Sequence, residues 1–334
     1  MKKIILITGW TGYIWSHWVV AFEQAGYKTV IVDNLVNSSI NTLDWIKKII
    51  WYKPDFFEID LKNKDDLEEV FKKYNFDWVI HFAGLKSPFE SQEKPILYFQ
   101  NNISGSINLF ELMDKYSVWN IVFSSSANTY SVLNTPPIKE NYLQSTTNPY
   151  WTSKFLLEKI LEDLSKFSKF NVINLRYFNP IWAHSSWELW ELPEWKPNNL
   201  FPFIFKVITW ELKELQVFGW DYETHDWSWM RDYIDVVDLV NAHLLAYKKI
   251  TKIKNNWFLD NYNVWTWKGL TVLDAIKNVE NTLEKKLNYR IVERRKWDIP
   301  ISFCDTTKIE KELGFKSEIS LEESIKNSWN FYNK

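Results

Sequence analysis

A tyrosine, a lysine and a short run of serines carry the most specific chemical pattern in this 334-residue sequence. Tyr150 and Lys154 are four residues apart, so on a helix both side chains lie on one face. An ammonium group beside a phenol lowers the phenol's pKa, and Tyr150 could then act as a base near neutral pH. The run Ser124-Ser125-Ser126 precedes Tyr150 by 24 residues and supplies hydroxyl groups. Alone, a Tyr-x-x-x-Lys pair is more often a solvated helix face, so its meaning depends on the surrounding fold.

Strands and helices alternate through the first half of the chain. Apolar runs typical of buried strands occupy residues 4–7, 29–32, 56–59, 78–82, 120–124 and 172–176. Helices are expected at 16–25, 64–74, 95–113 and 150–165. This alternation predicts an α/β protein with a doubly wound parallel sheet of the Rossmann type. The serines follow one expected strand, and catalytic groups in such sheets gather at the carboxyl ends of strands.

The turn between the first strand and the first helix has the pattern Gly9-x-x-Gly12-x-x-Trp15. In that context it approaches the dinucleotide-binding fingerprint, whose glycines let the backbone approach a pyrophosphate at a helix N-terminus. Asp33 ends the second strand, 24 residues after Gly9. Its carboxylate suits the ribose hydroxyls of NAD and would repel the 2′-phosphate of NADP. The alternative is an ordinary strand–helix turn with an aspartate cap, but the alternating fold favours an NAD site.

The alternation fades after about residue 180. A long loop is expected at 183–202, helices near 203–210, 236–248, 271–283 and 321–331, and a strand near 215–218. We therefore expect an NAD-binding Rossmann domain at residues 1–180. Residues 181–334 are expected to form a smaller, interleaved C-terminal α/β lobe, with some segments returning to the first domain.

Bulk composition excludes several classes of protein. The formal net charge is −2, so no nucleic-acid partner or charged membrane surface is indicated. The apolar N-terminal run 4–7 is too short for a signal peptide or a membrane span. The single cysteine, Cys304, excludes an internal disulfide framework and suits a reducing cytoplasm.

Several longer strings give the sequence a family resemblance. It resembles the extended short-chain dehydrogenase/reductase superfamily, and within it is similar to the UDP-glucose 4-epimerase family over almost the full length. The strings that carry the resemblance are His81-Phe82-Ala83-Gly84-Leu85-Lys86, Ser124-Ser125-Ser126-Ala127, Tyr150-x-x-Ser153-Lys154, Arg176-Tyr177-Phe178-Asn179-Pro180, Pro197-Asn198-Asn199-Leu200, Arg231-Asp232-Tyr233-Ile234 and Arg294-Arg295. Two departures concern fine specificity: Asn128-Thr129-Tyr130-Ser131 replaces the usual Thr-Val-Tyr-Gly, and Asp235 stands where a histidine is common.

The resemblance implies interconversion of UDP-glucose and UDP-galactose through transient oxidation at C4 of the sugar, with tightly bound NAD. It implies that Tyr150 removes the proton of the 4-hydroxyl, that Ser126 hydrogen-bonds this hydroxyl, and that Lys154 lowers the pKa of Tyr150 and binds the nicotinamide ribose. It also implies a UDP-sugar site in the C-terminal lobe and a homodimer formed through two long helices. Three alternatives stay open: an epimerase for another sugar such as UDP-N-acetylglucosamine, a nucleotide-sugar dehydratase or decarboxylase, and a non-catalytic NAD-binding protein.

The binding residues follow from the same resemblance. Besides Ser126, Tyr150 and Lys154, cofactor contacts are expected from Gly9, Gly12, Tyr13, Ile14, Asp33, Asn34, Asn37, Ser38, Asp60, Leu61, Phe82, Ala83, Gly84, Lys86, Asn101 and Phe178. Substrate contacts are expected from Asn179, Asn199, Leu200, Arg231, Arg295, Asp298 and Ser302. No metal is expected. Ser302 falls where the family gates the C2 substituent of the sugar, and a small residue there leaves room for an N-acetyl group.

Tryptophan is abundant and glycine scarce in this chain. It has 21 Trp and 8 Gly, where average usage would give about 23 Gly. Tryptophan replaces the usual family glycine at Trp10, Trp15, Trp151, Trp182, Trp187, Trp190, Trp195, Trp210, Trp227, Trp229, Trp265, Trp267 and Trp297. If these positions need left-handed backbone, each Trp costs roughly 1–2 kcal/mol. Thirteen such costs would exceed the typical stability of a domain, about 5–15 kcal/mol.

A difference in the genetic code explains why tryptophan replaces glycine at so many positions. Some bacterial lineages read UGA as glycine and others read it as tryptophan. The hypothesis is that the gene uses UGA for glycine and that these codons have been rendered as Trp. Trp329 lies at an ordinary tryptophan position and is expected to be genuine.

Overall fold

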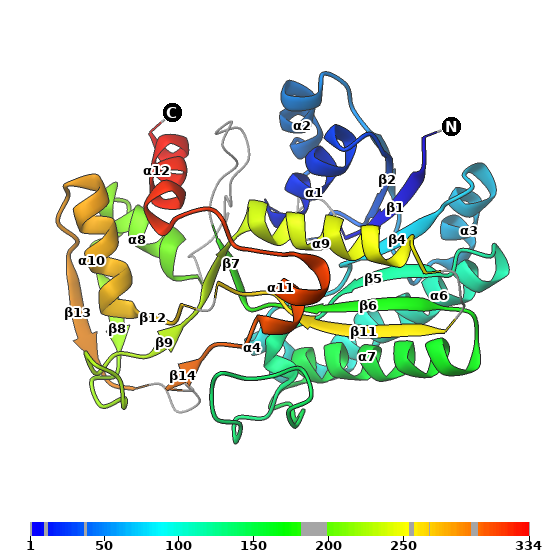
Figure 1. The fold of residues 1–334 in the computed structure, drawn as a ribbon. Coiled ribbons are helices and arrows are strands. Elements are labelled where there is room, and N and C mark those ends of the chain that lie inside the picture. Colours follow the sequence, from blue (N-terminus) through cyan, green and yellow to red (C-terminus); the bar gives the residue numbers. More distant parts are fainter. Residues whose placement is uncertain are drawn as a thin grey trace.

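The structure, a computed structural model, describes residues 2–9, 13–36, 39–181, 199–253, 257–266, 268–294 and 300–333, without the side chains of 13–15. Its centre is a seven-stranded sheet with the order β11-β6-β5-β4-β1-β2-β3 (Figure 1). The strands are β1 (Ile4–Thr8), β2 (Lys28–Asp33), β3 (Asp55–Glu58), β4 (Trp78–His81), β5 (Asn120–Ser124), β6 (Asn171–Arg176) and β11 (Phe258–Asn263). Every neighbouring pair is parallel. The predicted doubly wound sheet is confirmed.

Helices cover both faces of this sheet (Figure 1). One face packs against α1 (Tyr13–Gln24), α2 (Thr42–Ile50), α9 (Val236–Ile250) and α11 (Thr307–Leu313). The other packs against α3 (Lys64–Lys73), α6 (Gly105–Lys115) and α7 (Pro149–Phe167). Along β1, Ile5 and Ile7 join the first core and Leu6 joins the second. Because successive side chains of a strand point to opposite faces, a strand covered on both sides must be apolar throughout.

The expected helix at 95–113 is interrupted in its middle. It consists of α5 (Pro95–Phe99), a π-helical turn η1 (Gln100–Ser104) and α6. The short helix α4 (Pro88–Glu93) precedes it. A π turn inserts an extra residue into the helical ladder and often occurs at functional sites. Here it brings Asn102 into the interior, where it is 1% exposed.

The C-terminal lobe has a core of its own, built from α8 (Leu200–Ile208), α10 (Val272–Leu283), α12 (Leu321–Tyr332) and the strand β8 (Leu215–Phe218). β8 pairs with β13 (Tyr289–Val292). The remaining short strands are β9 (Met230–Arg231), β12 (Leu270–Thr271) and β14 (Ile301–Ser302), which form one sheet, and β7 (Asn179–Ile181) with β10 (Tyr233–Asp235). The loop expected at 183–202 ends earlier, because α8 begins at Leu200; residues 182–198 lie outside the described residues.

Sequence analysis expects no strand at residues 258–263, yet β11 forms the edge of the large sheet beside β6. Its polar residues, among them Asp260 and Asn261, obscure the strand pattern. An edge strand has only one paired neighbour, so polar side chains are tolerated there. β11 and α9 thus follow residue 181 in sequence but belong to the layers of the large sheet. None of the helices in the described part of the chain has the length and apolar character needed to cross a membrane.

Among the described residues, four tryptophans have left-handed backbone. Their φ angles are +71° at Trp51, +65° at Trp210, +66° at Trp227 and +83° at Trp257. This conformation costs a residue other than glycine roughly 1–2 kcal/mol. Of the positions that sequence analysis assigned to glycine, only Trp210 and Trp227 behave in this way among the described residues.

At four other positions the expectation of left-handed backbone is wrong. These residues are Trp15, inside α1, Trp151, inside α7, Trp229 and Trp265. Position 151 is helical because Asn148 and Pro149 begin α7 just before it. Positions outside the described residues are 10, 182, 187, 190, 195, 267 and 297, together with the side chain of Trp15.

Candidate active site

The helix that carries Tyr150 and Lys154 begins at a well-formed cap. The Asn148 side chain accepts a hydrogen bond from the backbone N–H of Trp151 at 3.0 Å, and Pro149 occupies the first helical position. Both are features that start a helix. Tyr150 therefore lies in the first turn of α7 and Lys154 one turn further on. The Lys154 Nζ donates to the backbone carbonyl oxygen of Ser124 at 2.9 Å, which places this helix face at the carboxyl end of β5.

Ser126 lies just beyond the end of β5. Backbone pairing with the neighbouring segment continues there, since Ser125 N donates to Leu175 O at 2.9 Å and Ala127 N donates to Tyr177 O at 3.0 Å. The Ser126 Oγ accepts from Asn128 N at 3.2 Å and caps the short helix η2 (Ala127–Thr129). Ser126 and Lys154 thus lie at the same strand end, and Tyr150 lies one turn before Lys154 on α7.

Burial dominates the electrostatics of this pair. It raises the pKa of Tyr150 to about 12, with a smaller contribution from the Tyr98 hydroxyl. Burial also lowers the pKa of Lys154 to about 8, against the opposing charge of Glu158. The net shift of the Tyr150 pKa is upward, so burial outweighs the expected lowering of this pKa by the Lys154 charge. The Lys154 ammonium is directed to the Ser124 carbonyl, and loss of water around the phenol outweighs it.

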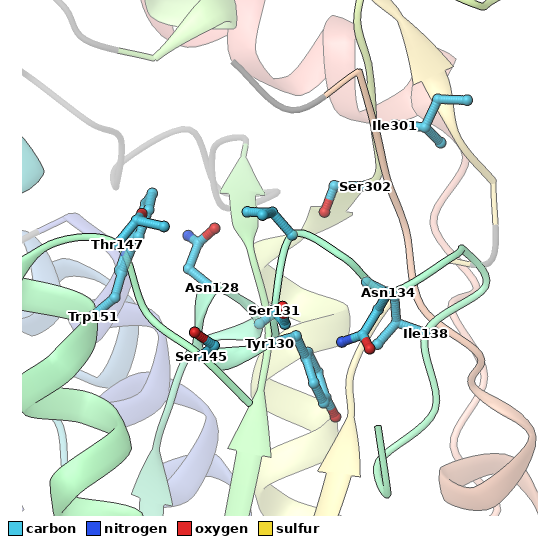
Figure 2. Close-up of a pocket in the computed structure, with 12 residues that line it drawn as sticks. Asn128, Tyr130, Ser131, Asn134, Ile138, Ser145, Thr147, Trp151, Ile301 and Ser302 are labelled. Atoms are coloured by element: carbon cyan, nitrogen blue, oxygen red, sulfur yellow. The ribbon is translucent and has the colours of Figure 1, made fainter. Parts of the chain in front are cut away.

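A small hollow, open to solvent, lies beside these residues. Figure 2 shows side chains from three parts of the chain around it: the segment after β5, the start of α7, and β14. Its lining consists of Ala127, Asn128, Tyr130, Ser131, Val132, Asn134, Ile138, Ser145, Thr147, Trp151, Ile301 and Ser302. Ser302, the predicted gate, therefore faces the same hollow as residues that flank Ser126 and Tyr150.

The end of β1 is shaped for glycine alone. Gly9 has φ +78°, and its N–H donates to Val32 O at 2.9 Å. A Cβ atom at this position would lie 2.4 Å from the Cα of Ala83, at the end of β4. Only glycine allows these two strand ends to approach so closely. Gly84, next to Ala83, has φ +157°.

The next two strand ends carry acidic and amide groups. The Asp33 Oδ1 accepts from Leu35 N at 2.7 Å, and the Asn34 Nδ2 donates to the Asp60 Oδ2 at 3.3 Å. The Leu61 side chain packs in the core between the sheet and helices α3, α6 and α7. The ends of β1, β2 and β3 thus place glycine, aspartate and asparagine along one sheet edge. This set fits NAD, because the glycine suits a pyrophosphate and the carboxylate suits ribose hydroxyls.

The remaining predicted cofactor residues divide by burial. Phe82 is 4% exposed and packs against Trp18 at 5.0 Å between ring centroids, so its side chain belongs to the core. Lys86 is exposed and Asn101 is half-buried in η1. Phe178 lies instead beside the predicted substrate residues.

The predicted substrate residues come from the second lobe. Arg231 on β9 is 7% exposed, and its guanidinium lies 4.6 Å from the ring centroid of Trp229 and 5.9 Å from that of Phe178. Ser302 pairs with Arg231 across the β14–β9 ladder. Asn179 begins β7, Asn199 is the N-cap of α8, and Leu200 is its first residue. Predicted residues outside the described ones are Gly12, Asn37, Ser38, Arg295 and Asp298, with the side chains of Tyr13 and Ile14.

Comparison with known proteins identifies the family. The sequence matches the family described as GDP-mannose 4,6 dehydratase over residues 6–328. The UDP-glucose 4-epimerase of Bacillus subtilis is 43% identical over 97% of this chain and 95% of the relative. That of Haemophilus influenzae is 43% identical over 98% and 96%. The chain belongs to the UDP-glucose 4-epimerase family.

Solved structures of this family agree with the fold. The UDP-glucose 4-epimerase from Stenotrophomonas maltophila with bound NAD and formylated UDP-arabinopyranose has a TM-score of 0.95 at 38% identity, covering 99% of this chain and 98% of that one. The enzyme from Bifidobacterium longum in complex with NAD+ and UDP has a TM-score of 0.92 at 39% identity, with the same coverage. The predicted cofactor residues Gly9, Asp33 and Asn34 of this chain lie at the strand ends described above.

Sequence analysis did not single out Asn102, which joins the segment after β4 to α7. Its Oδ1 accepts from Leu85 N at 2.7 Å, and its Nδ2 donates to Leu85 O at 3.0 Å and to Ser153 Oγ at 2.9 Å. The Ser153 hydroxyl in turn donates to the Tyr150 carbonyl at 2.6 Å. No sequence signal marks the π turn that presents Asn102. The amide therefore could not have been placed from sequence.

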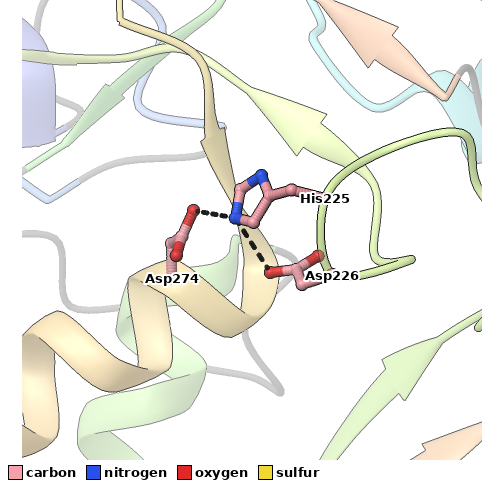
Figure 3. A group of neighbouring side chains, drawn as sticks. All are labelled: His225, Asp226 and Asp274. Atoms are coloured by element: carbon pink, nitrogen blue, oxygen red, sulfur yellow. Dashed lines mark ion pairs between the residues drawn. The ribbon is translucent and has the colours of Figure 1, made fainter.

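One group of side chains in the described residues has the composition of a metal site. Figure 3 shows His225 between Asp226 and Asp274, with its Nε2 3.7 Å and 2.9 Å from their carboxylates. The other Asp226 oxygen accepts from the backbone N–H and the hydroxyl of Ser228. These contacts tie the loop before β9 to the first turn of α10, away from the predicted catalytic residues. The cluster is therefore explained by its role in holding this loop against α10.

Proposed function

We propose that this chain is a UDP-glucose 4-epimerase, an NAD-dependent isomerase of nucleotide-sugar and galactose metabolism. The observation that carries the proposal is the contact of Lys154 with Ser124, which brings the Tyr150–Lys154 face of α7 to the serine-bearing end of β5. This strand end lies beside the glycine-shaped edge of β1 and β4. Membership in the family supplies the reaction to which this arrangement belongs.

The chemistry divides between cofactor and protein. Bound NAD would accept hydride from C4 of the sugar and return it to the opposite face. Tyr150 takes the proton of the 4-hydroxyl and later gives it back. Ser126 hydrogen-bonds the same oxygen, and the positive charge of Lys154 favours the phenolate. The 4-keto sugar must turn over in the pocket between the two transfers, so the net reaction is an isomerisation.

The substrate would be held by the second lobe. Arg231 is buried against aromatic rings and suits the diphosphate of a UDP-sugar, and Arg295 is predicted to act with it. Asn179, Asn199, Leu200 and Asp298 complete the predicted set. Ser302 lines the hollow in Figure 2, and its small side chain supports acceptance of N-acetylated sugars as well. The division into an NAD domain, 1–180, and a UDP-sugar lobe, 181–334, is part of this proposal.

The alternatives make different use of the same site. A dehydratase would usually carry Asp-Glu after the active-site strand, whereas this chain has Ala127-Asn128-Thr129-Tyr130. A non-catalytic NAD-binding protein has no need of a serine, a tyrosine and a lysine at one strand end. The deciding experiment is a coupled assay in which UDP-galactose is the substrate and UDP-glucose is detected by UDP-glucose dehydrogenase. Release of a 4-keto-6-deoxy sugar, or NAD binding without turnover, would contradict the proposal.

A homodimer and a cytoplasmic location complete the proposal. Exposed apolar side chains lie on the outer helices of one face: Phe89 (69% exposed), Ile96 (70%), Ile107 (41%) and Leu156 (36%). They come from α4, α5, α6 and α7, and supply an apolar face on which a second copy would pack. Light scattering should give about twice the chain mass, and Ile96→Glu should give the monomer. The unpaired, buried Cys304 supports a reducing compartment.

A further inference from the structure

A buried carboxylate lies one helical turn beyond Lys154. Glu158 is 4% exposed. Its Oε1 accepts from the Ser125 hydroxyl and from Arg176 Nε at 2.9 Å. Its Oε2 accepts from Arg176 Nη2 at 2.6 Å and from Gln144 Nε2 at 2.8 Å. Four hydrogen bonds therefore fix this carboxylate, and one of them leads to the residue next to Ser126.

The partner of Glu158 is fixed as firmly. Arg176, at the end of β6, is 3% exposed. Its Nη1 donates to the Tyr130 hydroxyl at 2.8 Å and to the Glu140 carbonyl at 2.9 Å. A buried bidentate pair has a single favourable geometry, so it fixes the positions of the two segments that carry the paired side chains. The pair thus joins α7, β6 and the segment around the hollow.

We propose that Glu158 is a positioning residue for the reaction: it holds the backbone that carries Ser126 through the Ser125 hydroxyl, and its charge keeps Lys154 in the ammonium form. The inference rests on the proposed function. Two contacts one turn apart, from Lys154 to the Ser124 carbonyl and from Ser125 to Glu158, lock α7 to the strand end. Neither contact touches the substrate, so Glu158 acts only through its neighbours.

The charge on Lys154 depends on few groups. Titratable or charged side chains on the elements packed around it are Tyr150 and Glu158 of α7, His81 of β4, Arg176 and Tyr177 at the end of β6, and His243 of α9. Burial lowers the pKa of His81 and of His243 to about 3, so both are neutral at physiological pH. Glu158 is therefore the negative charge that offsets the burial of Lys154.

The test is Glu158→Gln, which keeps the shape of the side chain, removes its charge and replaces one acceptor oxygen with a donor, so one arm of the pair with Arg176 is lost as well. Turnover should fall about tenfold with KM for UDP-galactose little changed, because the lesion lies outside the substrate site. The fall in activity on the alkaline side should move to lower pH, since Lys154 loses its proton more easily. Glu162→Gln is the matched control: the same change one turn further along α7, in a residue paired with exposed Lys159 and Lys166. It should leave both readouts unchanged.

Unchanged turnover and an unchanged pH profile in a folded Glu158→Gln protein would overturn the inference. A fall in turnover that is fully accounted for by a fall in the amount of bound NAD would overturn it as well. If the single variant does not fold, Glu158→Gln with Arg176→Gln removes both buried charges. Because these charges act on Lys154 in opposite directions, the pH profile should shift less than in the single variant, while the loss of turnover from the freed backbone of Ser125 should remain. NMR titration of lysine side chains measures the protonation of Lys154 directly and does not require an active enzyme. It therefore tests the charge effect in the unsubstituted chain as well, whereas an inactive glycine-restored enzyme would contradict the proposed function instead.

A separate observation concerns the left-handed tryptophans. Trp51 ends α2 with φ +71° and ψ +2°, and its N–H donates to the carbonyl four residues earlier at 2.8 Å. Gly314 ends α11 with φ +69° and ψ +19° and makes the same bond at 3.0 Å. The two helix ends have one geometry, and that geometry favours glycine because a Cβ strains it.

Packing does not compensate for this strain. Trp51 and Trp210 are each 85% exposed, Trp227 is 62% exposed and Trp257 is 69% exposed. Large indoles exposed to water on strained backbone gain little burial in return. Trp329 differs: it lies within α12, its ring stacks on Phe205 at 6.4 Å, and the Lys285 ammonium is 5.2 Å from its centroid.

We infer that glycine is the functional residue at positions 51, 210, 227 and 257. This extends the codon hypothesis to Trp51 and Trp257, which the sequence pattern did not identify. Mass spectrometry of peptides from the source cells should give glycine at all four positions and tryptophan at 329, with UGA as the codon of the four. Tryptophan masses in the peptides that contain positions 51 and 257 would overturn the inference.

Stability gives a second test that needs no source cells. Trp51→Gly should raise the Tm by a few degrees, because it relieves strain and removes exposed apolar surface. Trp329→Gly should lower the Tm, because it breaks a helix and a ring contact. A lower Tm for Trp51→Gly would show that the indole contributes to the fold as it stands.

Discussion

The Lys154 Nζ donates a hydrogen bond to the backbone carbonyl oxygen of Ser124 at 2.9 Å. This contact, rather than a direct approach of the ammonium to the Tyr150 phenol, is what joins α7 to the serine-bearing strand end. Burial raises the pKa of Tyr150 to about 12. Lys154 therefore has a structural role as well as its predicted electrostatic one.

Lys154→Met should reveal both roles at once. We expect kcat to fall about 10²–10⁴-fold, because the phenolate loses its positive neighbour. Tyr150→Phe should cause a loss of similar size while leaving the hydrogen bond to Ser124 intact. Steady-state kinetics measure the activity, and thermal unfolding should show a clear loss of stability for Lys154→Met only. Equal stability of the two variants would argue against the structural role.

Gly9→Ala tests the close approach of β1 to β4. The new Cβ would lie 2.4 Å from Ala83 Cα on backbone with φ +78°, so we expect a loss of roughly 2–4 kcal/mol in the free energy of unfolding and loss of bound NAD. Gly26→Ala is the control, because Gly26 has φ +90° and nothing within 4 Å of the added atom. It should cost about 1 kcal/mol and leave NAD binding unchanged. Urea unfolding and the absorbance of released NAD give the two readouts.

The glycine-restored cofactor turn should bind NAD better than the chain as written. Trp10 and Trp15 are predicted to fill the space of the pyrophosphate, so Trp10→Gly with Trp15→Gly should recover much of the affinity. Restoring all thirteen positions should recover activity. Isothermal titration with NAD compares the forms, and equal affinity before and after would refute the steric argument.

Ser302→Tyr tests the proposed substrate range. The unsubstituted site, in its glycine-restored form, should interconvert UDP-GlcNAc and UDP-GalNAc as well as UDP-glucose and UDP-galactose. A tyrosine in the wall of the hollow should remove the N-acetyl activity selectively. Kinetics on both substrate pairs decide the matter; N-acetyl activity that is absent from the start, or that survives the change, would place the gate elsewhere.

Asp235→Asn should alter the pH dependence of stability. Burial raises the Asp235 pKa from 3.8 to about 7, although Ser324 and Val237 donate hydrogen bonds to it. Between these two pKa values the folded chain binds more protons than the unfolded chain, so stability falls as pH rises through this range and stays lower above pH 7. The asparagine should remove this loss, a difference of a few kcal/mol at most. Urea unfolding at pH 5 and pH 8 measures it; equal pH dependence of the two proteins would contradict the prediction.

Local patterns in the sequence determined much of the fold and part of the site. Apolar runs identify β1, β2, β4, β5 and β6 within a residue or two, because strands covered on both faces have little choice of side chain. The spacing of Tyr150 and Lys154 predicted their shared helix face for the same local reason. Glu158 stands four residues beyond Lys154, a signal on the same face that sequence analysis did not use.

Only the tertiary structure decided how these pieces act together. The π turn that presents Asn102, the pairing of Glu158 with Arg176, and the edge strand β11 depend on contacts between distant segments, which no local period encodes. The pKa of Tyr150 depends on how much water the folded chain removes from the phenol. Residue types and spacing therefore predicted which groups meet, and packing set their charge and position.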